Sequence, residues 1–125
     1  MAIVGIGTDI VEIARFAQQG QSNQRLAQRV LTPVELEDFR TSNYAERFLA
    51  KRFAVKEAAV KAAGTGIGNG VSFQNIEVLH HPSGKPYLQF SGKLQELFDQ
   101  WGVTAHHVSI ADEQHYAVAT VILEK

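Results

Sequence analysis

The sequence contains no cysteine among its 125 residues. This absence excludes thiol catalysis, thiolate metal sites and a disulfide framework, and it fits a reducing compartment. The sequence also has no uncharged apolar run that approaches the roughly 20 residues needed to span a bilayer. The apolar start, residues 1–13, has no basic segment and is interrupted by Asp9, which is not typical of a signal peptide. We therefore expect a chain that works in the cytoplasm and does not bind a membrane.

The sequence has almost no net charge, because 12 Lys and Arg face 13 Asp and Glu. The balance excludes a general attraction to nucleic acid or membrane. The charges are unevenly placed, however. Residues 40–61 hold six basic and two acidic side chains, and residues 13–31 hold Arg15, Arg25 and Arg29 and no acid. This half favours a partner with clustered negative charge, and among these nucleic acid is the weakest candidate because aromatic residues do not alternate with the basic ones.

The order of the predicted elements indicates an α+β fold with a largely antiparallel sheet, in one domain over residues 1–125. Strands are predicted at 2–13, 71–80, 86–90, 106–111 and 115–123, and helices at 33–40, 44–63 and 92–101. Residues 14–31 are predicted to form a helix or an ordered loop. Capping boxes at 32–35 and 43–46 are expected to begin the first two helices. Residues 115–123 are apolar on both faces, which favours a central strand.

The glycines form no complete nucleotide-binding motif. GIGTDI (5–10) and GTGIGNG (64–70) both fail the pattern G-x-G-x-x-G, and no P-loop pattern occurs. Turn residues are therefore the favoured interpretation, although the N–H groups of loop 64–70 can offer donors to an anion. Gly5 and Gly7, inside a predicted strand, indicate that another element approaches the backbone closely.

Two features carry candidate chemistry but are weak by themselves. Glu57 and Lys61 lie four residues apart on the predicted helix 44–63 and share its face with Phe53. From spacing alone, a weak surface ion pair is favoured over a catalytic pair. His107 and Ser109 share one face of a predicted strand, and the spacing leaves open whether His107 has a catalytic role.

Four stretches of the sequence resemble the holo-[acyl-carrier-protein] synthases, the small class of 4′-phosphopantetheinyl transferases. They are GIGTDIVEIARF (5–16), RFAVKEAAVKAAGTGI (52–67), NIEVLHHPSGKPYL (75–88) and HHVSIADEQHYAVATVI (106–122). The second contains the diagnostic pattern F-x-x-K-E-A-x-x-K-A, and the four occur in the family's order over nearly the whole chain. The resemblance reverses the preference for a surface ion pair at Glu57 and Lys61.

The resemblance implies a phosphopantetheinyl transferase fold, in which a largely antiparallel sheet packs with a long helix. It also implies Mg²⁺-dependent transfer of phosphopantetheine from coenzyme A to a serine of an apo acyl carrier protein, with release of adenosine 3′,5′-bisphosphate. Asp9 and Glu57 match the residues that hold the metal, and Lys61 matches a lysine beside the transferring phosphate. The base that takes the serine proton stays open among Glu57, Asp9 and a metal-bound water. The family forms homotrimers with active sites at subunit interfaces.

Further residues are expected to contact the coenzyme and the carrier. For coenzyme A they are Lys61, Gly64, Gly66, Lys85, Pro86, His107 and Ser109. For the acidic carrier they are Arg15, Arg25 and Arg29, of which only Arg15 lies in a matched stretch; the other two are inferred from charge. Such arginines would raise the association rate more than the affinity.

Two alternatives remain beside the transferase. One is a non-catalytic module of the same fold that binds coenzyme A or a nucleotide. The other is a basic docking module for acidic partners. The presence of Asp9, Glu57 and Lys61 together disfavours both, because a binding module does not need this set of charged side chains.

Overall fold

The computed structural model of the protein describes residues 1–17 and 21–125. The strands are β1 (Ile3–Glu12), β2 (Ile76–His80), β3 (Pro86–Phe90), β4 (Ala105–Asp112) and β5 (Tyr116–Glu124). The helices are α1 (Gln21–Val30), α2 (Pro33–Thr41), α3 (Ala45–Ala63) and α4 (Gly92–Trp101), with short 3₁₀ turns η1 (Ile13–Phe16) and η2 (Phe73–Asn75). This confirms the predicted α+β class. Within the described residues, no helix has the length and apolar character to cross a membrane.

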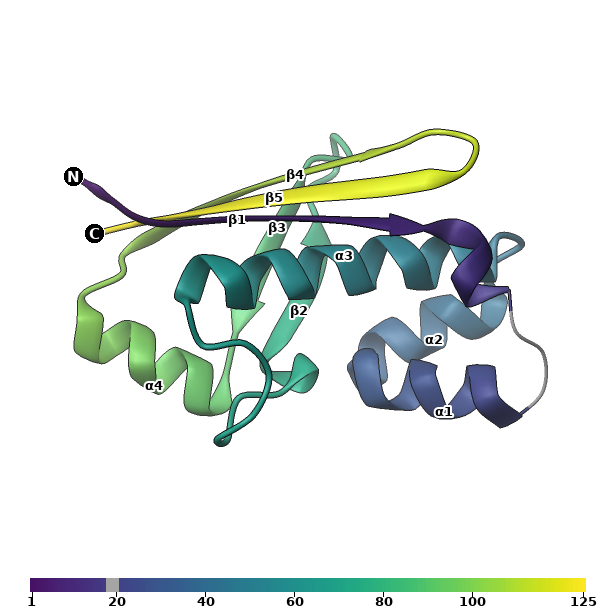
Figure 1. Ribbon diagram of the computed structural model, residues 1–125, viewed down its shortest axis with the longest axis horizontal. Coiled ribbons are helices and arrows are strands. Elements are labelled where there is room, and N and C mark those ends of the chain that lie inside the picture. Colours follow the sequence, from purple (N-terminus) through teal and green to yellow (C-terminus); the bar gives the residue numbers. More distant parts are fainter. Residues whose placement is uncertain (18–20) are drawn as a thin grey trace.

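The strands form two antiparallel sheets, one of three strands in the order β1-β5-β4 and one made by β2 and β3. The predicted central position of β5 is confirmed. The long helix α3 runs along one face of the three-stranded sheet, as Figure 1 shows, and α1, α2 and α4 lie beyond α3. The β2-β3 hairpin lies against β4, at the sheet edge opposite β1.

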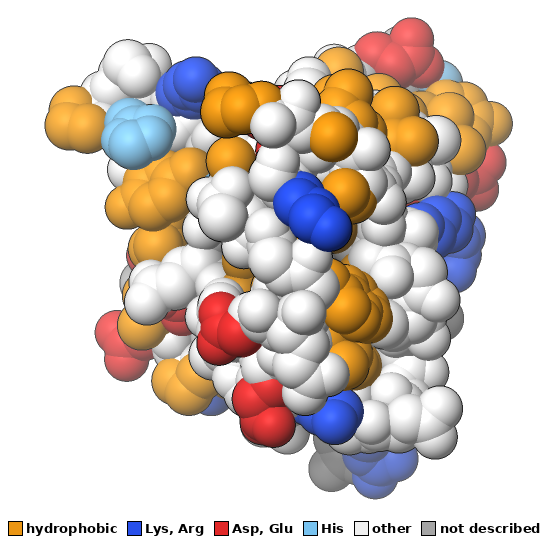
Figure 2. Space-filling model, turned by 90° about the vertical axis from the view of Figure 1, so that its left-hand side faces the viewer, with side chains coloured by type: hydrophobic (Ala, Val, Ile, Leu, Met, Phe, Trp, Pro, Cys, Tyr) orange, Lys and Arg blue, Asp and Glu red, His pale blue; other side chains and the backbone are white. Residues whose placement is uncertain are grey.

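The two faces of the three-stranded sheet differ in burial. On the inner face, toward α3, Val11 of β1 lies beside Ala117 of β5, and both are buried. On the outer face, Ile6 and Ile10 of β1 are 66% and 64% exposed. Hydrophobic side chains accordingly gather along the upper edge of Figure 2, where the outer side of the sheet is seen from the end of the molecule. The sheet is therefore covered on one face only in a single chain.

Strand β1 packs directly on the backbone of α3 at Gly5 and Gly7, as the sequence predicted. A Cβ atom on Gly7 would lie 2.1 Å from the carbonyl oxygen of Ala58 and 2.5 Å from the nitrogen of Ala62. A Cβ atom on Gly5 would lie 2.0 Å from the carbonyl oxygen of Ala62. Because these atoms belong to a helix backbone, no rotamer change can make room. The two glycines and the alanines of α3 therefore set how close β1 lies to the helix.

We expect the substitution Gly7→Ala to lower the free energy of unfolding by about 1–3 kcal/mol, because it overpacks this contact. Urea unfolding measures the effect, and Glu12→Ala, at an exposed position of the same strand, serves as the control. Stability equal to that of the wild type would show that β1 and α3 can separate at no cost.

Of the two predicted capping boxes, one is present and one is not. Thr32 and Glu35 form the expected capping box before α2, and Gly64 and Gly102 end α3 and α4 in the left-handed conformation, with φ of 77° and 75°. The second predicted capping box, at 43–46, is wrong: Tyr44 occupies the N-cap position and makes no side-chain capping bond. The predicted strand at 71–80 begins only at Ile76, because Phe73–Asn75 form η2, which Ser72 caps with a capping box.

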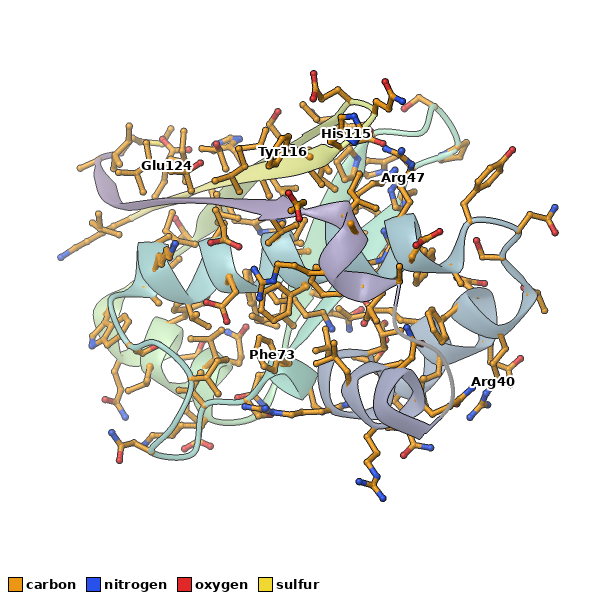
Figure 3. The ribbon with its side chains drawn as sticks, turned by 45° about the vertical axis from the view of Figure 1, so that its right-hand side comes forward. Arg40, Arg47, Phe73, His115, Tyr116 and Glu124 are labelled. Carbon is orange, nitrogen blue, oxygen red and sulfur yellow. The ribbon has the colours of Figure 1, made fainter. Side chains whose placement is uncertain are left out.

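The first turns of α3 are tied to the turn between β4 and β5 by Arg47. Its Nη1 donates to Asp112 Oδ2 at 2.8 Å and to the carbonyl oxygen of Glu113 at 2.6 Å, and its Nη2 donates to the carbonyl oxygen of Gln114 at 3.1 Å. Figure 3 shows Arg47 pointing to this turn, near His115. The carboxylate of Asp112 therefore has its partner on α3.

A buried ionic cluster lies on the opposite side of α3. Lys56 is completely buried and its Nζ donates to Glu35 Oε1 at 2.6 Å, to the carbonyl oxygen of Val30 at 2.7 Å and to that of Phe73 at 3.3 Å. Glu35 Oε2 accepts from the backbone N–H of Val78 at 2.9 Å. Lys56 thus has a partner for each of its three protons, and the cluster joins α3 to α2, η2 and β2.

Candidate active site

Three charged side chains from two elements come together where β1 crosses the last turns of α3. Asp9 lies on the inner face of β1, between the buried positions Gly7 and Val11. Glu57 and Lys61 are one turn apart on α3, which runs against this face. The structure therefore brings together the three residues that the resemblance assigned to the metal and the transferring phosphate.

Lys61 pairs with Asp9 and not with Glu57. Its Nζ lies 2.9 Å from Asp9 Oδ1 and donates at 3.1 Å to the carbonyl oxygen of Thr8. The Asp9 side chain is 15% exposed, whereas the Lys61 side chain is 51% exposed. The spacing in the sequence favoured an ion pair between Glu57 and Lys61 along one helix face. In the structure, Lys61 instead pairs with Asp9 on the neighbouring strand.

The surroundings of Glu57 disfavour the ionised form of its carboxylate. Burial raises the pKa of Glu57 above its ordinary value, and the charge of Asp9 raises it further. Lys61 and Arg29 act in the opposite direction. Two carboxylates thus lie close enough to repel each other, while the ammonium of Lys61 contacts only that of Asp9. This arrangement favours an additional positive charge or a proton.

The donor set fits Mg²⁺. Asp9 Oδ2 is buried and has no hydrogen-bond partner, so one oxygen of this carboxylate lacks the contact that a buried anion requires. Mg²⁺ takes oxygen ligands, commonly one or two carboxylates with phosphate oxygens and water in the remaining positions. Within residues 1–17 and 21–125, no group of three or more His, Cys, Asp or Glu side chains is placed to hold a metal by itself. Asp9 and Glu57 therefore suit an ion that is shared with a phosphate ligand.

An aromatic row continues from this site toward α1. The rings of Phe16, Phe53 and Phe73 are spaced 5.4 and 5.6 Å apart, and Phe53 lies one turn before Glu57 on α3. The guanidinium of Arg15 lies 5.7 Å from the ring centre of Phe16, and that of Arg29 lies 5.7 Å from that of Phe73. Two of the three arginines predicted to dock a carrier thus stand at the two ends of a row whose middle ring, Phe53, precedes Glu57 by one helical turn.

Arg25 is the third predicted docking residue. It lies exposed on α1, one turn before Arg29. The sequence before Arg25 is rich in glutamine, and residues 18–20 of it lie outside the described residues. The docking role of the three arginines stays a prediction.

The glycine loop after α3 has backbone donors that are already used. The N–H of Gly64 donates to the carbonyl oxygen of Lys61 at 3.0 Å, and the N–H of Gly66 donates to that of Val60 at 3.3 Å. These bonds complete the C-terminal end of the helix, where the backbone carries partial negative charge. The N–H groups of Gly64 and Gly66 thus already have acceptors within the chain. A contact of these glycines with coenzyme A through other atoms stays a prediction.

The remaining predicted coenzyme residues lie elsewhere in the chain. His107 and Ser109 share a face of β4, as predicted, but it is the outer face of the sheet, away from Asp9. His107 Nε2 lies 2.5 Å from Glu124 Oε1 on that face. Lys85 and Pro86 lie at the turn of the β2-β3 hairpin, beyond β4. One chain therefore does not bring these four residues to the Asp9 site.

Sequence reasoning missed the role of Lys56, which stands directly before Glu57 in the quoted motif. Its charge suggested a basic surface, but its side chain is buried on the other side of the helix. The partner that holds it there, Glu35, comes from α2, so no local spacing could have revealed the pair. The glutamate in the capping box was the only signal, because Glu35 Oε1 accepts both the N–H of Thr32 and a proton of Lys56.

Comparison with known proteins shows the family to which this chain belongs. Residues 5–121 match the family model described as the 4′-phosphopantetheinyl transferase superfamily. The holo-[acyl-carrier-protein] synthase of Pseudoalteromonas atlantica is 58% identical over 124 residues, which cover 99% of this chain and 98% of the relative.

Solved structures agree. The crystal structure of the holo-[acyl-carrier-protein] synthase from Neisseria meningitidis has a TM-score of 0.91 and 41% identity, covering 99% of this chain and 100% of that one. The synthase from Helicobacter pylori, solved in complex with coenzyme A, has a TM-score of 0.82 and 30% identity, covering 95% and 99%. The chain therefore belongs to the holo-[acyl-carrier-protein] synthase family of phosphopantetheinyl transferases.

Proposed function

We propose that this chain transfers the 4′-phosphopantetheine group of coenzyme A to a serine hydroxyl of an apo acyl carrier protein. The observation that carries the proposal is the meeting of Asp9, Glu57 and Lys61 beside a row of aromatic rings and arginines. Two findings support it: full-length relatives bear the name of this activity, and one structural relative binds coenzyme A. We also propose the cytoplasm as its compartment, which the cysteine-free sequence fits.

In the proposed reaction the serine oxygen attacks the phosphorus that carries the pantetheine arm. The bond from this phosphorus to the bridging oxygen breaks, and adenosine 3′,5′-bisphosphate leaves. Asp9 and Glu57 would hold Mg²⁺, which supplies positive charge to the diphosphate when it is bound. The proton of the serine would go to one of the two carboxylates of the site, Glu57 or Asp9. In the chain without metal, burial and the charge of Asp9 raise the pKa of Glu57.

Lys61 has the reach to contact the same diphosphate. Its side chain is half exposed, and its ammonium is a point charge on a flexible stem. Once it leaves Asp9, it can donate to a phosphate oxygen and offset the charge that develops on the leaving group. Arg15, Arg25 and Arg29 would bring the acidic carrier to this site through electrostatic steering.

We propose that three copies assemble through the outer face of the three-stranded sheet. Opposed residues of β1, β5 and β4 form rows on this face, among them Ile6–Ile122–His107 and Ile10–Val118–Ala111. An exposed apolar sheet face of this kind marks a contact with another chain. Assembly would also account for His107, Ser109, Lys85 and Pro86, which cannot serve the Asp9 site of their own chain but can serve that of a neighbour.

We expect Ile6→Asp to convert the trimer into monomers, because it places a charge from each copy within this apolar contact. Sedimentation velocity measures the change. Val34→Asp is the matched control, since Val34 is 57% exposed but lies on α2, away from the sheet. A wild-type monomer, or a trimer that survives Ile6→Asp, would contradict the assignment of this face.

The transfer itself is tested with coenzyme A labelled in its pantetheine arm and an apo acyl carrier protein. We expect the label on the wild-type carrier and adenosine 3′,5′-bisphosphate in solution in equal amounts. A carrier whose acceptor serine is replaced by alanine should take up no label. Binding of coenzyme A without transfer to any of several carriers would favour the non-catalytic module instead.

A further inference from the structure

We infer that the ammonium of Lys61 occupies the cation position of the Asp9 site until a divalent metal displaces it. The inference rests on the proposed assignment of Asp9 and Glu57 to the metal. It gives Lys61 a second role, because the residue expected to meet the phosphate also controls how tightly the chain alone binds the metal.

The first observation is the partner of Lys61. Its Nζ contacts Asp9 Oδ1 at 2.9 Å and the carbonyl oxygen of Thr8 at 3.1 Å, so two oxygens of β1 surround it. Hard cations take the same kinds of ligand, namely carboxylate and carbonyl oxygens. The ammonium therefore holds one oxygen of the carboxylate that a metal at Asp9 would use, while the other, Oδ2, has no partner.

The second observation is the difference in freedom between the two partners. Asp9 is held by the strand and its side chain is 15% exposed, whereas that of Lys61 is 51% exposed. Lysine has a flexible stem with a rotatable ammonium group, so Lys61 can move into solvent while Asp9 stays in place. The exchange of ammonium for metal thus needs no movement of the backbone.

The third observation is the charge of the site. Asp9 and Glu57 carry two negative charges when ionised, and Lys61 neutralises one of them. If Lys61 stays in place, a divalent cation at Asp9 is repelled by its like charge. If the cation displaces Lys61, the ion pair between Lys61 and Asp9 is lost. Either way, Lys61 weakens metal binding to the free chain. A diphosphate ligand offers the released ammonium a new partner, which makes metal and coenzyme A bind cooperatively.

The alternative is that Lys61 acts only on the phosphate. The two possibilities differ in the absence of coenzyme A. If Lys61 meets only the phosphate, its removal leaves the metal affinity of the free chain unchanged. If it occupies the cation position, its removal tightens metal binding while it slows transfer.

Isothermal titration of the free chain with Mn²⁺, without coenzyme A, tests the inference. We expect Lys61→Met to bind Mn²⁺ about three- to tenfold more tightly than the wild type, the scale of a lost ion pair and one like charge. Lys61→Gln should behave the same way. Lys51→Met is the matched control, because Lys51 lies on the same helix, 4.0 Å from Asp112, and its loss should leave the affinity unchanged.

Asp9→Asn separates the inference from the proposed metal site. If Asp9→Asn abolishes Mn²⁺ binding and the Lys61 variants bind as the wild type does or more weakly, the inference is wrong and the metal site stands. If Asp9→Asn binds Mn²⁺ as the wild type does, the metal assignment fails and the inference falls with it.

Discussion

Replacing Glu57 with Gln is expected to lower the rate of phosphopantetheine transfer at least about a hundredfold. The variant keeps the size of the side chain but removes the negative charge that would hold the metal and the oxygen that would accept the serine proton. Asp9→Asn should cause a similar loss, because it removes the second carboxylate and the partner of Lys61. The rate is measured as labelled carrier formed per minute at saturating Mg²⁺.

The fold should survive this change, and stability measurements can show it. Because the pKa of Glu57 is raised in the folded chain, its ionised form is disfavoured there. The folded chain therefore loses stability as pH rises from the ordinary glutamate value through the raised one, and Glu57→Gln does not show this loss. At neutral pH the variant should be at least as stable as the wild type. Glu46→Gln, in the first turn of α3, is the control for activity. Wild-type transfer by Glu57→Gln would remove Glu57 from the site.

Replacing Lys56 with Met is expected to lower the free energy of unfolding by about 3–5 kcal/mol, since it leaves the carboxylate of Glu35 buried without its closest partner. Glu35 is 1% exposed, and the nearest remaining cation, Arg52, has its Nε 3.7 Å from Glu35 Oε2. Two backbone carbonyls, of Val30 and Phe73, lose their donor as well. Against the roughly 5–15 kcal/mol that typically stabilises a domain, this is a large loss.

Urea unfolding of Lys56→Met measures the effect, with Lys51→Met as the more exposed control, expected within about 0.5 kcal/mol of the wild type. A double variant, Lys56→Met with Glu35→Gln, should regain part of the loss because the unpaired charge is gone. A Lys56→Met variant as stable as the wild type would show that the cluster is not needed for the fold.

Local sequence signals predicted most elements because local chemistry decides where they end. Thr32 and Glu35 begin α2 through two reciprocal hydrogen bonds, and Gly64 and Gly102 adopt a backbone conformation that other residues rarely take. The failure at 43–46 has a local cause as well. The N–H of Tyr44 donates to Ser42 Oγ, so the polar side chain that serves this turn is one residue earlier than the motif required.

The candidate site was less accessible to local reasoning. The spacing of Glu57 and Lys61 suggested a pair with each other, but β1 supplies Asp9 as the partner of Lys61, and only the packing of Gly5 and Gly7 against α3 brings it near enough. Family resemblance identified the three residues because it encodes such long-range contacts. The resemblance could not show that the N–H groups of Gly64 and Gly66 donate to carbonyl oxygens in the last turn of α3.

The division of the predicted coenzyme residues has a similar explanation. His107 and Ser109 alternate onto the outer face because strand residues alternate between faces. Sequence alone could not tell which face meets α3. In the structure, β4 presents His107 and Ser109 on the face away from α3. These two residues therefore lie apart from Asp9 within one chain.

The intact mass of an apo acyl carrier protein, measured after incubation with the chain, coenzyme A and Mg²⁺, tests the central claim most directly. Over the time in which the wild type just completes the transfer, the account predicts a gain equal to one phosphopantetheine group with the wild type and no gain when Mg²⁺ is removed with EDTA. Over the same time, Asp9→Asn or Glu57→Gln in place of the wild type should modify at most about one carrier in a hundred. An unchanged carrier mass with the wild type, or an equal gain with the two variants, would contradict it.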